Sequence, residues 1–95
     1  MTKQIKLNEN EAMVVQSAMA PYPSDHEMAE GIYRQASPEK FGCQSYIWIK
    51  LKNEDECQLL VESLEGLVDV HEDDLKEVGL LQDAKALASA AHDLI

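Results

Sequence analysis

The densest group of potential metal ligands in the sequence is the run at residues 69–74, with the sequence DVHEDD. Carboxylate oxygens of this kind are the ligands that calcium and magnesium prefer. The run lacks the spacing of an EF-hand loop, because no glycine occupies the turn position, and no second histidine follows His71 by four residues as in zinc proteases. We interpret the run as an acid-rich helix start, with a divalent-metal site or a metal-dependent enzyme as the alternative.

The side chains most often used for acid–base and nucleophilic catalysis are few and scattered. His26, His71 and His92 are far apart in the sequence, and Cys43 and Cys57 lie in no nucleophile signature. Two cysteines fourteen residues apart, without a CxxC motif, are typical of buried reduced thiols rather than of a disulfide or a zinc site. The sequence therefore predicts no catalytic residue, no bound metal and no cofactor.

Carboxylates are concentrated in a predicted helix that follows Asn53. Six of them lie within fifteen residue steps, or about 22 Å of helix. This is one negative charge per ~3.7 Å, close to the ~3.4 Å spacing of phosphates along one nucleic-acid strand. The alternative is a solvated helix face, because the first three acids can cap the helix and the six do not share one side. The six are Glu54, Asp55, Glu56, Glu62, Glu65 and Asp69.

A second acidic cluster, Glu72, Asp73, Asp74 and Glu77, extends the negative field. The charge is unevenly divided along the chain. Residues 1–52 carry six acids and six bases, whereas residues 53–95 carry twelve acids and two bases, so the whole net charge of −10 lies in the C-terminal part. Such a charge opposes direct binding to nucleic acid or to an anionic membrane, and it favours a basic partner protein.

Tyr46 and Trp48 lie two residues apart in a predicted strand, and therefore on the same face of it. Trp and Tyr are the residues that most often dominate protein–protein interfaces, so the pair is a candidate anchor for a partner. The alternative is that the pair packs under a helix or loop of the same domain.

Hydrophobic periodicity predicts two strands and four or five helices. Asn8, Ser24 and Asn53 are each followed three residues later by a glutamate, which is the capping-box pattern of a helix start. Gly79 is a predicted helix end. The predicted strands cover residues 3–7 and 45–52, and the predicted helices cover residues 9–20, 25–36, 54–68, 72–78 and 81–94.

These elements predict a single α+β domain over residues 1–95, in which a small two-stranded sheet packs against the helices. Residues 1–52 form its charge-neutral strand-helix-helix-strand part, and residues 53–95 form its acidic helical part. No apolar run is long enough to span a membrane or to serve as a signal peptide, so we expect a cytoplasmic protein.

The patterns together predict a non-enzymatic interaction module that binds a basic protein, such as a nucleic-acid-binding protein, by charge mimicry. Small acidic proteins of phages use this strategy, a parallel that rests on size and charge. The alternative is an assembly protein that forms a homodimer or larger oligomer through the alanine-rich helix at 81–94 or a free sheet edge. The predicted partner-binding residues are Glu62, Glu65, Asp69, Glu72, Asp73, Asp74 and Glu77, with Tyr46 and Trp48 as the apolar anchor.

Overall fold

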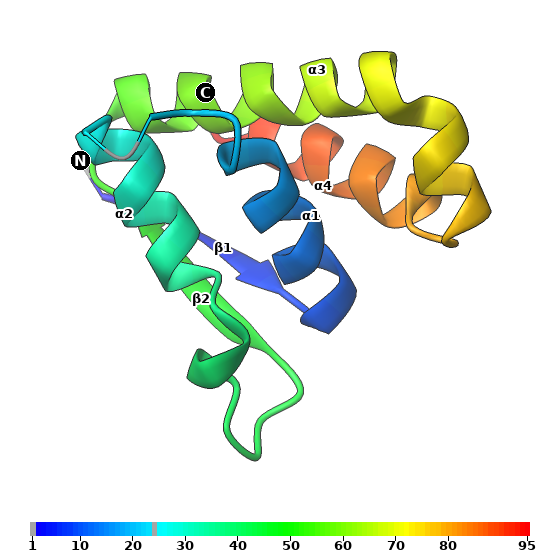
Figure 1. The fold of residues 1–95 in the computed structure, drawn as a ribbon. Helices are drawn as coiled ribbons and strands as arrows, with labels where there is room; N and C mark the ends of the chain where they lie inside the picture. Colours follow the sequence, from blue (N-terminus) through cyan, green and yellow to red (C-terminus); the bar gives the residue numbers. More distant parts are fainter. Residues whose placement is uncertain (1, 24) are drawn as a thin grey trace.

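The computed structural model describes residues 2–23 and 25–95, which form a two-stranded sheet and four α-helices (Figure 1). The predicted α+β class is confirmed. In chain order the elements are β1 (Lys3–Leu7), α1 (Glu9–Met19), α2 (Glu27–Gln35), a 3-10 helix (Pro38–Lys40), β2 (Ile47–Leu51), α3 (Glu54–Glu77) and α4 (Leu81–His92).

The two strands pair with each other in antiparallel fashion. Ile5 lies opposite Ile49, and Lys6 lies opposite Trp48. Because side chains alternate between the two faces of a strand, one face of the sheet carries only Lys3 and the aliphatic residues, while the other carries lysines, Gln4 and Trp48. The aliphatic face is covered by helices, and the other face is open to solvent.

The helix starts at Asn8 and Asn53 confirm the predicted caps. The Asn8 side chain accepts a hydrogen bond from the Glu11 amide (2.8 Å), and the Glu11 carboxylate accepts one from the Asn8 amide (3.0 Å). The Asn53 side chain likewise accepts from the Glu56 amide (2.9 Å). The Glu56 carboxylate, however, accepts from the Lys52 amide and is only 8% exposed, so Glu56 does not belong to the acidic surface.

Helix α2 starts two residues later than predicted. The backbone of His26 is extended, and its ring Nδ1 accepts a hydrogen bond from the Ala29 amide (3.3 Å). His26 is therefore the N-cap, and Asp25 precedes the helix. Ser24, the predicted cap, lies outside the described residues.

Helix α3 continues through the segment where we expected a break. The expected interruption at residues 69–71 is reduced to a kink at His71, whose φ of −116° and ψ of 27° are not helical. The helix ends at Gly79 as predicted, with a φ of +79° that favours glycine. The Gly79 amide donates to the Lys76 carbonyl and the Leu80 amide to the Leu75 carbonyl, which is a Schellman motif.

One hydrophobic core joins the aliphatic face of the sheet to the helices. Helix α4 lies alongside α3 (Figure 1) and buries Ala84, Leu87 and Ala91. Leu60 and Leu64 of α3 are fully buried on the opposite side of the helix from its acids. The core therefore holds α3 as a rigid support for whatever its outer face presents.

Candidate interaction surfaces

The exposed side of α3 carries a row of carboxylates, which we term the acidic stripe. At roughly 100° per residue, its first five acids fall within a sector of about 100°. Glu72 lines the same shallow hollow as Glu65 and Asp69, so the row continues past the kink. The expectation that all six acids do not share one side holds because of Glu56, which points elsewhere and is buried, whereas the other five do share one side. The stripe consists of Glu54, Asp55, Glu62, Glu65, Asp69 and Glu72.

The carboxylates of the stripe form no ion pair within 4.0 Å among the described residues, although Lys3 lines a hollow with Glu54 and Asp55, and Lys85 lines the hollow with Glu65, Asp69 and Glu72. Among residues 2–23 and 25–95, one ion pair joins Arg34 to Glu30 (2.9 Å) and another joins His71 to Asp74 (3.4 Å). Neither pair includes a stripe carboxylate. The only side-chain hydrogen bond to the stripe within these residues is neutral, from the Gln58 amide to Glu62 (3.1 Å). Six carboxylates with two lysines beside them leave a net negative field on this side of the molecule.

The remaining predicted acids lie on the last turns of α3. Asp73, Asp74 and Glu77 are exposed beyond the kink, and Asp74 faces the ring of His71. Within the described part of the chain, no three His, Cys, Asp or Glu side chains lie close enough together to hold a metal ion. The acids of residues 69–74 thus spread along a helix rather than converge.

Tyr46 and Trp48 are 49% and 58% exposed, so the interpretation that they pack under another element is wrong. They lie with lysines on the solvent-facing side of the sheet. The Lys6 ammonium nitrogen lies 4.1 Å from the centre of the Tyr46 ring, a cation–π contact, and Lys6 is the cross-strand partner of Trp48. We term this surface the outer sheet face: Gln4, Lys6, Tyr46, Trp48 and Lys50.

The two predicted groups of partner-binding residues form separate surfaces. The start of β2 lies at the end of the molecule away from α3 (Figure 1). Tyr46 therefore lies next to Lys6, and not beside the carboxylates that it was expected to accompany.

A third feature escaped sequence reasoning, namely a groove between the α1–α2 loop and α3. It has a volume of about 300 Å³ and includes the stripe residue Glu62 in its lining. We term it the Tyr22 groove, and its lining is mostly apolar but includes polar side chains: Ser17, Ala18, Pro21, Tyr22, Glu62, Ser63, Gly66, Leu67, Val70 and His71. Val70 is 73% exposed, although it is a large aliphatic residue on a helix. Gly66 and Val70, four residues apart on α3, were the sequence signals that could have indicated it.

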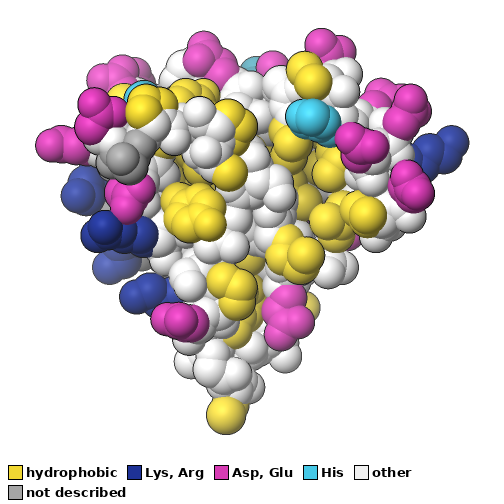
Figure 2. All heavy atoms as spheres, in the orientation of Figure 1, with side chains coloured by type: hydrophobic (Ala, Val, Ile, Leu, Met, Phe, Trp, Pro, Cys, Tyr) yellow, Lys and Arg dark blue, Asp and Glu magenta, His cyan; other side chains and the backbone are white. Residues whose placement is uncertain are grey.

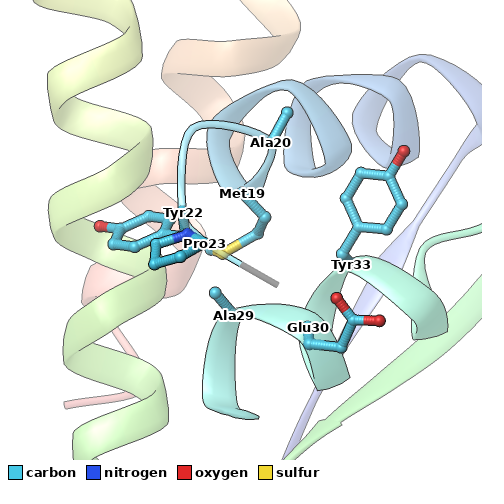
Figure 3. A pocket seen from close by; sticks show the side chains of 7 residues that line it. All are labelled: Met19, Ala20, Tyr22, Pro23, Ala29, Glu30 and Tyr33. Carbon is cyan, nitrogen blue, oxygen red and sulfur yellow. The ribbon is translucent and has the colours of Figure 1, made fainter. Parts of the chain in front are cut away.

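Tyr22 separates this groove from a second hollow of about 200 Å³ between α1 and α2. Figure 3 shows Tyr22 pointing toward α3, whereas Tyr33 lies across the second hollow. In the space-filling view, hydrophobic side chains gather on the face over α1, α2 and α3, and carboxylates lie along much of its edge (Figure 2). The face thus has an apolar centre, with carboxylates along much of its margin and Lys and Arg side chains gathered along one edge.

The two cysteines differ from each other. Cys57 is buried, as predicted, and burial raises the pKa of its thiol, an effect that the nearby Lys3 ammonium partly opposes. Cys43 is exposed, so the expectation that both thiols are buried is wrong for this residue. It lies in the loop before β2, where no element covers it.

The alanine-rich helix and the sheet edge, which suggested self-assembly, are partly covered by contacts within the chain. The alanines of α4 that are most buried, Ala84 and Ala91, face its own core. On β2, the side-chain amide of Gln35 donates to the Lys50 carbonyl (3.0 Å) and accepts from the Lys50 amide (2.7 Å). The amide therefore takes the place of a neighbouring strand at this point of the edge.

No family model matches the chain, and comparisons with curated proteins and with solved structures found no match. Within the part of the chain that the structure describes, no helix has both the length and the apolar character needed to cross a membrane.

Proposed function

We propose that the protein is a non-enzymatic interaction module whose acidic stripe binds a basic partner protein in the cytoplasm. The observation that carries the proposal is the row of stripe carboxylates on one side of α3, none of them paired with a lysine or arginine among the described residues. Exposed carboxylates that are not held in ion pairs do not have to break such pairs on binding, and they steer an oppositely charged protein toward this side.

The spacing of the charges supports a partner that binds nucleic acid. The six stripe carboxylates, from Glu54 to Glu72, extend over about 27 Å of helix. This length corresponds to about eight phosphates along one strand at ~3.4 Å each. A groove that is built for a phosphate backbone therefore meets a comparable density of negative charge on this helix.

The helix also suits this role mechanically. Because Leu60 and Leu64 fix its inner side in the core, the carriers of the charges do not have to be ordered on binding. Tyr46 and Trp48, on a different side of the molecule, contribute a second contact only where the partner reaches the outer sheet face.

The test is a capture experiment with three immobilised forms of the protein: the unchanged chain, a stripe variant and a control variant. Both variants change the net charge from −10 to −6, so a difference between them reports position and not total charge. The stripe variant carries Glu62→Gln, Glu65→Gln, Asp69→Asn and Glu72→Gln. The control variant carries Asp25→Asn, Glu27→Gln, Glu39→Gln and Asp93→Asn.

We expect the unchanged chain and the control variant to capture the same basic nucleic-acid-binding protein at about 50 mM salt and to lose it at about 200 mM salt. The stripe variant does not capture it. The purified partner then loses its nucleic acid when the unchanged chain is added. Equal capture by all three forms would show that the stripe is only a solvated helix face.

A further inference from the structure

The Tyr22 groove joins an apolar hollow directly to the acidic stripe. Glu62 belongs to both, and Gly66 and Val70 follow it at four-residue intervals along α3. Each of these steps turns the helix by about 40° away from the stripe, so the surface changes from charged to apolar across one helix. Figure 2 shows apolar side chains with carboxylates beside them on this face of the molecule.

The wall of the groove is fixed before anything binds. The Tyr22 hydroxyl and the Ser63 hydroxyl lie 2.9 Å apart, which ties the α1–α2 loop to α3. The Tyr22 ring also packs edge-on against the His26 ring, with the centres 5.0 Å apart. A preformed apolar hollow of this kind lowers the ordering cost of binding.

Gly66 has no structural reason to be glycine. It lies in the middle of α3, where glycine destabilises a helix, and a Cβ built on it meets no atom within 4 Å. Its φ is not positive, so the backbone does not require glycine. An exposed helical glycine in a groove leaves room for a side chain that comes from another molecule.

We infer that the Tyr22 groove accepts an apolar side chain from a basic amphipathic segment of the partner. The inference rests on the proposed function and names the part of the partner that docks. The choice of a basic segment follows from charge complementarity, because the apolar groove borders the unpaired carboxylates of the stripe, through Glu62. Lysines or arginines that flank the apolar anchor lie against the stripe while the anchor fills the groove.

The test uses two synthetic octapeptides of equal charge, KKLKKLKK and KKSKKSKK, with binding measured by fluorescence anisotropy at about 50 mM salt. The leucines are three residues apart and share one side of a helix. We expect the leucine peptide to bind about tenfold more tightly than the serine peptide, because one leucine is buried in the groove. In nuclear magnetic resonance spectra, the leucine peptide alone shifts the amide signals of Gly66, Leu67 and Val70.

A matched pair of variants locates the effect. In Gly66→Leu the new side chain fills the groove, whereas in Gly31→Leu the same change is made in the middle of α2, outside this groove. Neither site has an atom within 4 Å of the added Cβ, and leucine is the better helix former, so both variants melt above the unchanged protein. We expect Gly66→Leu to remove the preference for the leucine peptide, and Gly31→Leu to retain it.

The outcomes separate this inference from the proposed function. Equal binding of both peptides, unchanged in Gly66→Leu, overturns the groove inference and leaves the stripe proposal intact. Failure of both peptides to bind overturns the stripe proposal as well. If light scattering finds a dimer that Gly66→Leu converts to a monomer, the occupant is a second copy of the chain and the inference is wrong.

Discussion

The acidic stripe and the outer sheet face are charged surfaces of opposite sign. The stripe consists of carboxylates on one side of a helix, while the outer sheet face carries Lys6 and Lys50 around Trp48. Along the sequence the N-terminal part is neutral, because Glu30 offsets Arg34 and other acids offset the lysines. In the folded chain, side chains alternate between the two faces of each strand, and this places Lys6 and Lys50 together on the outer sheet face. A segment with no net charge therefore has a positive surface.

The largest expected effect compares the two faces of β2. Ile49 is fully buried, and Ile49→Ala should lower the free energy of unfolding by about 3 kcal/mol through lost burial and a cavity. Trp48→Ala, one residue earlier, should cost less than about 1 kcal/mol, because Trp48 faces solvent. Urea denaturation measures both. A cost for Trp48→Ala that equals that of Ile49→Ala would mean that the outer sheet face supports the fold.

The next effect compares the charged surfaces as binding sites. At about 50 mM salt, the stripe variant should bind the peptide KKSKKSKK at least tenfold more weakly than the unchanged chain does. Lys6→Gln combined with Lys50→Gln should leave this affinity the same or slightly higher, since it removes positive charge. Anisotropy titrations measure both. A comparable loss in the lysine variant would contradict the separation of the two surfaces.

A smaller effect concerns stability. Glu62, Glu65, Asp69 and Glu72 are spaced by three or four residues, and each like-charged pair at this spacing destabilises a helix by about 0.2–0.5 kcal/mol. The stripe variant should therefore be more stable than the unchanged chain by about 1 kcal/mol at low salt, and the gain should shrink as salt is added. Thermal unfolding at two salt concentrations measures it. A loss of stability would mean that these acids have structural partners.

The smallest effect lies between the two surfaces, in the core, at Cys57 near Lys3. Because burial raises the pKa of this thiol above its ordinary value, the folded state holds the thiol proton more tightly than the unfolded state. The resulting loss of stability begins as the pH rises past the ordinary thiol pKa of about 8.5 and is complete above the raised value. Urea midpoints of the unchanged chain should therefore fall more steeply with alkaline pH than those of Cys57→Ala. Parallel curves would contradict this.

Local patterns in the sequence predicted the secondary structure well, because their causes are local. The alternation in residues 3–7 and the Asn8 capping box need no distant contact. The start of α2 was misplaced because the His26 ring also serves as a cap, which the Ser24-x-x-Glu27 pattern obscured. The exposure of Trp48 could not be predicted, since it depends on whether helices cover one face of the sheet or both.

The candidate surfaces were predictable only in part. Helical geometry places the stripe carboxylates on one side once Glu56 is excluded. The sequence does not show that Glu56 is buried, because its carboxylate accepts a hydrogen bond from the Lys52 amide only in the folded chain. The Tyr22 groove depends on the α1–α2 loop folding back onto Ser63, a contact between residues far apart in the sequence. No periodicity within a single element contains such information.

The Gln35 side chain has a consequence for the behaviour of this protein at high concentration. Unpaired strand edges recruit strands from other chains, which is a common route to aggregation. The Gln35 side-chain amide already forms hydrogen bonds with both main-chain groups of Lys50. A strand from another chain can therefore pair with β2 at this point only after it displaces that amide. The Glu56 carboxylate guards the next outward amide, that of Lys52, in the same way. Resistance to misassembly is thus built into two side chains that have no part in either charged surface.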